Sequence, residues 1–261
     1  MTEIVTRPAQ HQQRVNHVQP LLALARAETR LFLRDKFTSL LGVGLPAAVL
    51  AGLGAVRALR EPSEVFGGMR FVDFYAPSLL AISIAVLGLQ NLPTGLATYR
   101  EKGILRRLSA TPASPAAVLV VQLLLNFVAV AVGTVLMVTV AVAVFEVPAP
   151  RHPLGFGLAF VCGTAAVFAI GLVIAAVAPR ARVAAGMGTV AFMLTQFFAG
   201  VYLPKFLLPD VVVRIGEFVP PGAGALQGAW TGGGADPVQL VVMALTAAVA
   251  AGVAVRLFRW E

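Results

Sequence analysis

Charged residues are scarce in this chain: Asp, Glu, Lys and Arg make up 12% of its 261 residues, about half of their share in a soluble domain. Hydrophobic residues make up 58% of the chain, and the mean hydropathy is +0.85. A chain of this composition must bury surface in lipid as well as in its own core. The composition therefore excludes an ordinary water-soluble protein.

Cysteine, lysine and histidine are also rare. Cys162 is the single cysteine and lies in an apolar run, so the chain can form neither an internal disulfide nor a thiolate metal cluster. The three lysines follow Asp, Glu and Pro, so none belongs to a Walker A motif. The three histidines lie outside the long apolar runs, and no GxSxG or HExxH motif occurs. We therefore expect no catalytic residues, metal or cofactor in this chain.

Six apolar runs without Asp, Glu, Lys or Arg are candidate membrane spans. Each has at least 18 residues, and a helix rising about 1.5 Å per residue needs roughly 20 to cross a hydrocarbon core about 30 Å thick. The sequence thus predicts an all-α integral membrane protein with a six-helix transmembrane domain over residues 37–256. The runs are Phe37–Val56, Phe74–Ala97, Ala116–Phe145, Leu154–Ala178, Gly186–Leu203 and Val238–Val255.

Polar segments flank these spans. Residues 1–20 are predicted to be a flexible N-terminus, and residues 257–261 a C-terminal tail. Residues 21–36 are predicted to be an amphipathic interface helix, because arginines recur every four residues and form a basic stripe. Composition alone favours a helix that lies on anionic lipid. The stripe consists of Arg26, Arg30 and Arg34, and Glu28 falls outside it.

The net charge of +8 is distributed unevenly between the two sides of the membrane. If both termini lie on one side, that side holds 14 of the 20 basic and 5 of the 12 acidic residues, a net charge of +9. The other side then carries −1. The positive-inside rule predicts a multi-pass protein of the plasma membrane with both termini in the cytoplasm. No nucleic acid is needed to explain the basic excess.

Five charged residues cluster within residues 100–107, in the connection between the second and third spans. Its spacing is consistent with charges that only orient the two spans and contact lipid phosphates. The charged residues are Arg100, Glu101, Lys102, Arg106 and Arg107. Ser114 and Pro115 form an N-cap and first-turn pair for the following helix.

The same connection resembles a known family. Arg100-Glu101-Lys102-Gly103, then Arg106-Arg107-Leu108, Thr111-Pro112 and Ser114-Pro115, resembles the cytoplasmic segment of ABC type-2 permeases, which include daunorubicin-resistance-type drug exporters. The resemblance implies that this connection is seated on a nucleotide-binding ATPase subunit, which holds ATP and Mg. It also implies that the helix over residues 21–36 touches that subunit, and that the permease forms a homodimer or a heterodimer with a paralogue.

Polar and aromatic side chains inside the spans leave two interpretations open. They form hydrogen bonds between helices, or they line a pathway for an apolar or amphipathic substrate. The candidates are Gln90, Asn91, Gln122, Asn126, Phe192, Thr195, Gln196 and Phe197.

The segment Pro204–Trp230, between the fifth and sixth spans, is broken by prolines and is too short to span twice. We predict a re-entrant-like outer segment. It is either an ordinary loop packed on the bundle or, by resemblance, an external gate.

We therefore expect the membrane permease subunit of an ABC exporter that moves a drug, antibiotic or lipid outward and relies on a separate ATPase. Two alternatives stay open. One is a membrane scaffold or assembly subunit that transports nothing. The other is an ion-coupled secondary carrier, which is disfavoured because the six apolar runs contain no ionisable residue of the kind such carriers use.

Overall fold

The computed structural model describes residues 18–34, 40–66, 68–104, 107, 115–202 and 208–257. Across these ranges the chain is helical, and pairing between extended residues is limited to one isolated bridge between Pro62 and Arg70. The predicted tail from residue 258, most of the predicted flexible N-terminus, and Arg106 lie outside the described residues. The fold class is all-α, as the sequence predicts.

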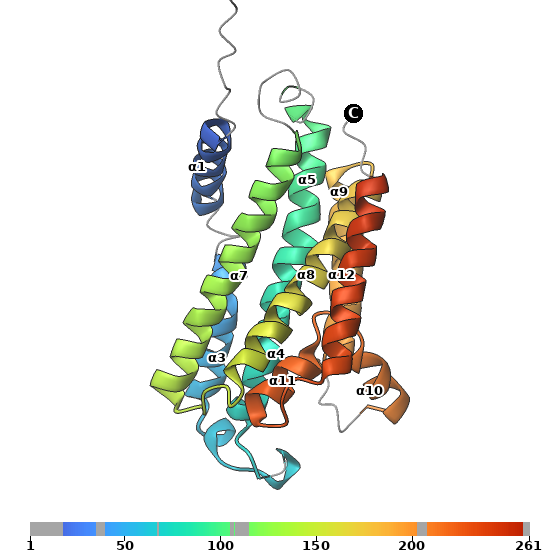
Figure 1. Cartoon of the computed structure of the whole chain (residues 1–261). Helices are drawn as coiled ribbons and strands as arrows, with labels where there is room; N and C mark the ends of the chain where they lie inside the picture. Colours follow the sequence, from blue (N-terminus) through green and yellow to red (C-terminus); the bar gives the residue numbers. More distant parts are fainter. Residues whose placement is uncertain are drawn as a thin grey trace, which may run out of the picture.

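The long helices run side by side along one axis (Figure 1). α10 and α11 lie at one end of this bundle, and α1 lies beside α7 toward the other end. In chain order the elements are α1 (Val18–Arg34), η1 (Leu40–Gly44), α3 (Leu45–Ala55), η2 (Arg57–Arg60), η3 (Glu64–Phe66), α4 (Phe71–Ala85), η4 (Val86–Asn91), α5 (Leu92–Glu101), α7 (Pro115–Phe145), α8 (Pro153–Val177), α9 (Ala181–Phe198), α10 (Asp210–Glu217), α11 (Ala223–Thr231) and α12 (Pro237–Leu257).

Within the part of the chain that the structure describes, four helical segments are long and apolar enough to cross a membrane by length and composition. They are Phe71–Glu101, Ala117–Phe145, Pro153–Val177 and Pro237–Leu257. The other two predicted spans fall short for different reasons. The first is an apolar helix of only 14 residues, Gly42–Ala55. The fifth, α9, starts at Ala181 instead of Gly186 and so includes the charged Arg182.

Proline and glycine account for several helix boundaries. α7, α8 and α12 each begin at a proline, which costs nothing at a first helical position because the N–H there has no partner within the helix. α9 ends at Phe198, where the predicted run continues to Leu203. Gly200 follows with a φ of +75°, a left-handed conformation that stops the helix.

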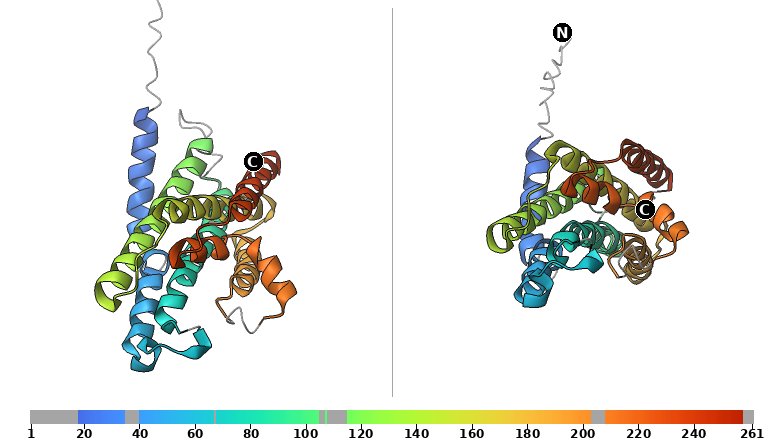
Figure 2. Two further views of the ribbon diagram at one scale, coloured as in Figure 1. Left: turned by 60° about the horizontal axis from the view of Figure 1, so that its bottom comes forward. Right: turned by 90° about the horizontal axis from the view of Figure 1, so that it is seen from below.

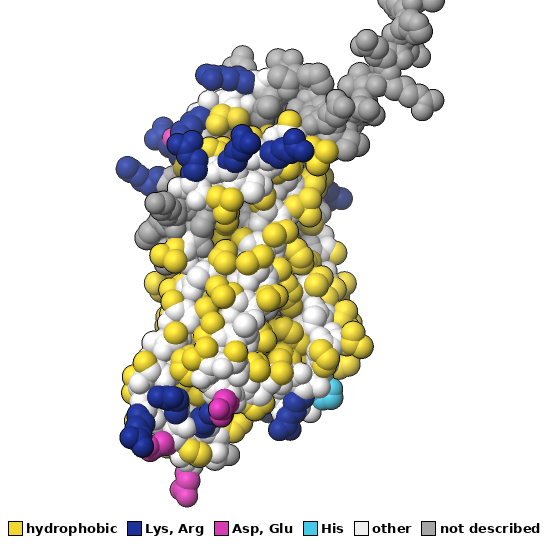
Figure 3. Space-filling model, turned by 90° about the vertical axis from the view of Figure 1, so that its left-hand side faces the viewer, with side chains coloured by type: hydrophobic (Ala, Val, Ile, Leu, Met, Phe, Trp, Pro, Cys, Tyr) yellow, Lys and Arg dark blue, Asp and Glu magenta, His cyan; other side chains and the backbone are white. Residues whose placement is uncertain are grey.

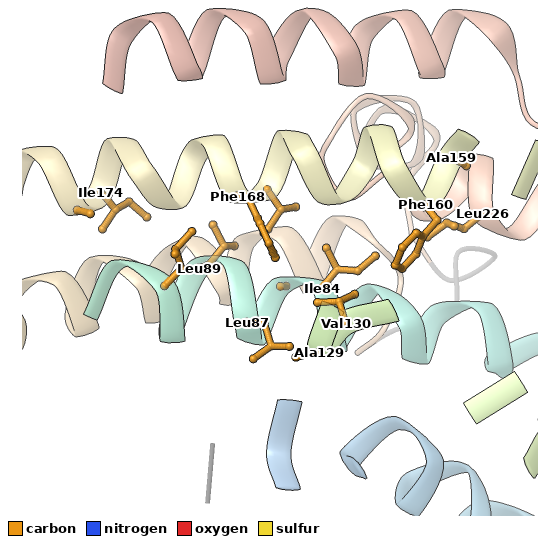
Figure 4. Close-up of a cluster of buried hydrophobic side chains, with 14 of the residues drawn as sticks. Ile84, Leu87, Leu89, Ala129, Val130, Ala159, Phe160, Phe168, Ile174 and Leu226 are labelled. Atoms are coloured by element: carbon orange, nitrogen blue, oxygen red, sulfur yellow. The ribbon is translucent and has the colours of Figure 1, made fainter. Parts of the chain in front are cut away.

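The rod formed by α4, η4 and α5 lies at the centre of the bundle. In the most apolar 18-residue stretch of this rod, 72% is buried inside the protein. The corresponding share is 33% for α7 and 17% for α12. Ile84 and Leu89 from this rod pack with Phe168 and Ile174 of α8, while Val130 of α7 joins the same cluster (Figure 4). α12 lies on the outside of the bundle against α8 (Figure 2).

Glycines allow two helices to approach the central rod backbone to backbone. A Cβ atom at Gly171 of α8 would overlap the carbonyl oxygen of Gly88, and one at Gly188 of α9 would overlap that of Leu89. Gly88 and Leu89 are consecutive residues of the π-helical segment η4. The fold therefore depends on small residues where α8 and α9 meet η4.

The predicted outer segment forms two different short helices. α10 is mostly exposed, whereas α11 buries Leu226 and Trp230 among the longer helices. A Cβ atom at Gly163 of α8 would overlap the carbonyl oxygen of Pro221, so the turn before α11 lies directly against α8. α11 is thus part of the packed bundle.

Candidate functional site

Basic side chains gather at the end of the molecule where α1 lies (Figure 3). The middle of that face is apolar, and the opposite end carries side chains of both signs. Two of the charged sequences singled out above meet at the basic end: α1 and the chain that leaves α5. The basic end is therefore the candidate surface for contact with a partner.

Arg100 and Glu101 both bind the turn between α8 and α9. The Arg100 guanidinium donates to the carbonyl oxygens of Ala175, at 3.1 Å, and Ala178. The Glu101 carboxylate accepts a hydrogen bond of 3.1 Å from the backbone N–H of Ala181, the first residue of α9. An arginine at the carbonyl end of one helix and a carboxylate at the N–H end of the next both satisfy backbone groups that have no partner within their helix.

Lys102 and Arg107 are exposed, as Glu101 is. The chain turns at Gly103, whose φ is +65°, and the Arg107 N–H donates to the Gly103 carbonyl oxygen at 3.1 Å. Arg106 lies outside the described residues. Of the five residues predicted to couple the chain to an ATPase, Arg100 and Glu101 therefore hydrogen-bond to the turn between α8 and α9, and Glu101, Lys102 and Arg107 are exposed.

On α1, the arginine stripe and the acidic residue face different surroundings. Arg26, Arg30 and Arg34 are exposed, whereas Glu28 is buried. Its Oε2 atom accepts hydrogen bonds of 2.7 Å from the Tyr99 hydroxyl and from the Gln122 side-chain amide. One carboxylate thus joins α1 to α5 and α7 through hydrogen bonds.

This polar junction continues through two asparagines. The Asn91 amide donates to Oδ1 of Asn126 at 2.9 Å, and the Asn126 amide donates to the backbone carbonyl of Gln122 at 2.8 Å. Asn91 of η4 is therefore joined to α7 through Asn126, and Gln122 of α7 is joined to α1 through Glu28. Glu28 and Tyr99 were not predicted to belong to this hydrogen-bonded junction. One signal in the sequence could have indicated that the Glu28 carboxylate is buried: Glu28 shares one helix face with Leu24, Leu31 and Phe32.

The candidates on α9 lie elsewhere. The buried Gln196 donates to the Ala81 carbonyl oxygen of α4 at 3.4 Å, and the Thr195 hydroxyl donates to the Phe192 carbonyl oxygen at 2.9 Å. Phe192 is half-buried, and Phe197 is 36% exposed. Gln90, on the central rod, is also half-buried. Hydrogen bonds therefore join Asn91 to α7 and Gln196 to α4.

No cluster of three or more His, Cys, Asp or Glu residues suited to a metal ion occurs in the described part of the chain. The described side chains at this end offer hydrogen bonding, charge and apolar surface.

Comparison with known proteins identifies the family. Residues 19–221 match the family described as ABC-2 type transporter. Neither the curated proteins nor the solved structures give a match. The match covers α1, the central rod, the basic connection and the helices through α10. The chain therefore belongs to the ABC-2 type transporter family, whose membrane domain is the transmembrane part of ABC transporters and works with a separate ATP-binding subunit.

Proposed function

We propose that the chain is the permease subunit of an ABC exporter, with both termini in the cytoplasm and six membrane-crossing helices formed by η1–α3, α4–η4–α5, α7, α8, α9 and α12. Two such subunits, identical or paralogous, surround a pathway for a hydrophobic or amphipathic substrate such as a drug, antibiotic or lipid. The observation that carries this proposal is the family match over a helical bundle with one strongly basic end.

Coupling to the ATPase is proposed at the connection after α5. Lys102 and Arg107 are exposed there and are available to a partner surface. Arg100 and Glu101 join the end of α5 to the turn between α8 and α9. A push on the connection would therefore displace the ends of three helices together and would not bend one loop alone. The exposed arginines of α1 supply a second contact with the ATPase or with anionic lipid.

The test is a double charge reversal. Lys102→Glu with Arg107→Glu should reduce co-purification of the ATP-binding subunit at least about tenfold, because close charge pairs at an interface contribute more than ~1.4 kcal/mol. It should also abolish the ATP hydrolysis that the permease stimulates. Arg57→Glu with Arg60→Glu is the matched control, since η2 is exposed at the opposite end of the bundle. If the first pair changes neither measurement, the coupling proposal is wrong.

Reconstitution of the complex in liposomes separates an exporter from a scaffold. Amphipathic compounds and lipids are added, and ATP hydrolysis is measured for each. An exporter shows stimulation by at least one of them that depends on this chain. A scaffold shows none, although its ATP-binding partner still co-purifies.

A further inference from the structure

At the junction of α1, α5 and α7, a carboxylate is buried, and no Lys, Arg or His side chain of the described residues forms an ion pair with it. Glu28 is 7% exposed, and its two hydrogen-bond donors, Tyr99 and Gln122, are neutral. Over the ranges that the structure describes, the ion pair observed is that between Arg70 and Asp73, at the other end of the bundle. A buried charge that only neutral donors compensate retains a strong attraction for a cation.

A small cavity lies directly beside this carboxylate. Its volume is about 160 Å³, and Glu28, Asn91, Tyr99 and Gln122 supply its polar wall. None of the described residues that line it is Lys, Arg or His. Phe32 and Tyr99 are among the lining residues, and aromatic rings can attract cations. The cavity therefore suits a compact, positively charged group.

The small cavity adjoins a larger apolar groove. Phe32 and Leu125 line both, so the two spaces are neighbours. The groove has a volume of about 670 Å³, which lies within the range of pockets that hold drug-sized ligands. Leu33, Val128 and Val132 line it and are exposed, so it opens at the outer surface of α1 and α7. Its single polar side chain, Thr29, donates to the carbonyl oxygen of Ala25.

We propose that the two spaces form one binding site for an amphiphile of net positive charge. Its ammonium group lies against Glu28, and its hydrocarbon tail occupies the groove between α1, η1 and α7. A zwitterionic phospholipid fits less well, because none of the described residues that line either space is a Lys or Arg that could pair with a phosphate. This inference concerns binding alone and does not depend on the proposed coupling to an ATPase.

The experiment measures equilibrium binding of radiolabelled hexadecyltrimethylammonium to the purified full chain in maltoside micelles. Hexadecanol is the uncharged probe with the same tail, and dodecylphosphocholine is a zwitterionic competitor. The ammonium probe should bind at least tenfold more tightly than the alcohol, and the zwitterion should displace it poorly. Equal binding of the two probes, or efficient displacement by the zwitterion, would overturn the proposal.

Glu28→Gln tests the carboxylate. The glutamine side chain still offers an oxygen to Tyr99 and Gln122, so α1 keeps its attachment while the charge is lost. Affinity for the ammonium probe should fall at least tenfold, and affinity for the alcohol should not change. Glu64→Gln is the control, because Glu64 is an exposed carboxylate at the far end. Unchanged preference for the cation in Glu28→Gln contradicts the assignment.

Gly95→Leu tests the cavity in a chain that keeps its fold. Gly95 lines the small cavity, and a Cβ atom there would meet nothing within 4 Å. A leucine side chain therefore fills the space without pushing on the backbone, and it raises the helix propensity of α5. Tm should stay the same or rise, while the preference for the cation should disappear. A folded Gly95→Leu chain that binds the ammonium probe as the wild type does overturns the proposal.

Discussion

At the residue scale, Arg70 makes the densest set of side-chain contacts at the end of the bundle opposite α1. Its guanidinium donates to both carboxylate oxygens of Asp73, at 2.7 and 2.8 Å, and to the backbone carbonyls of Phe145 and Glu146. The hydrogen bond with Asp73 raises the pKa of Arg70, and burial opposes it only in part. Glu146 has a φ of +54°, which is uncommon for a residue with a side chain. Arg70 thus holds the start of α4 on the turn that follows α7.

Arg70→Lys should therefore destabilise the chain although the charge is kept. A lysine ammonium cannot bind both oxygens of a carboxylate and two carbonyls in one plane. We expect a loss of about 2 kcal/mol, since hydrogen bonds that involve charged groups contribute roughly 1.5–3 kcal/mol each. The measurement is Tm in detergent, with Arg60→Lys on the exposed η2 as the control. An equal Tm for both variants would show that the cluster adds nothing to stability.

At the scale of elements, the close approach of α8 and α9 to η4 leaves no room for a side chain at the contact. Gly171→Ala places a methyl group where the Gly88 carbonyl oxygen lies, so α8 must move away from the central rod. Such overpacking costs about 1–3 kcal/mol, and the Tm should fall accordingly. Gly157→Ala on the same helix is the matched control, because a Cβ atom there meets nothing within 4 Å. That control should leave the Tm unchanged or raise it, and a similar decrease in both variants would contradict the contact.

Helices were predictable from the sequence to the extent that local signals mark them. The apolar runs that begin at Ala116, Leu154 and Val238 each follow a proline and place the starts of α7, α8 and α12 to within one residue. The predicted start of α9 is five residues late, because an uncharged run excludes Arg182, which the helix includes. The bounds of apolar runs therefore miss a helix end where the helix continues through a charged residue.

The contacts of the candidate site were less predictable, because they join distant parts of the chain. Glu28 meets Tyr99 and Gln122 over separations of 71 and 94 residues. Glu101 binds the N-terminus of α9 over 80 residues. Composition and periodicity report which residues share one helix face, but not which helix that face meets. The resemblance to a family likewise marked the charged connection as a unit. In the structure, Arg100 and Glu101 hydrogen-bond to the turn between α8 and α9, whereas Lys102 and Arg107 lie exposed farther along the connection.

At the scale of the whole molecule, charge asymmetry is the feature that sets its direction in the membrane. Lysine and arginine dominate one end of the bundle, and an apolar zone separates that end from one of mixed sign (Figure 3). Positively charged segments are retained on the cytoplasmic side during insertion, whereas acidic residues have little influence. We therefore expect the end that carries α1 and Lys102 to face the cytoplasm and the end that carries η2 to face outward.

Single-cysteine labelling tests this orientation, and the chain suits the method because Cys162 is its one native cysteine. In a Cys162→Ser background, Arg57→Cys and Lys102→Cys place thiols at exposed positions at opposite ends. A membrane-impermeant maleimide added to intact cells should label the thiol at position 57, and should label that at position 102 only after permeabilisation. The two variants control each other, because each shows that the reagent reacts with an exposed thiol on this chain. The reverse order would mean that the basic excess faces outward, and the proposed cytoplasmic contact between the 102–107 connection and an ATPase would then be impossible.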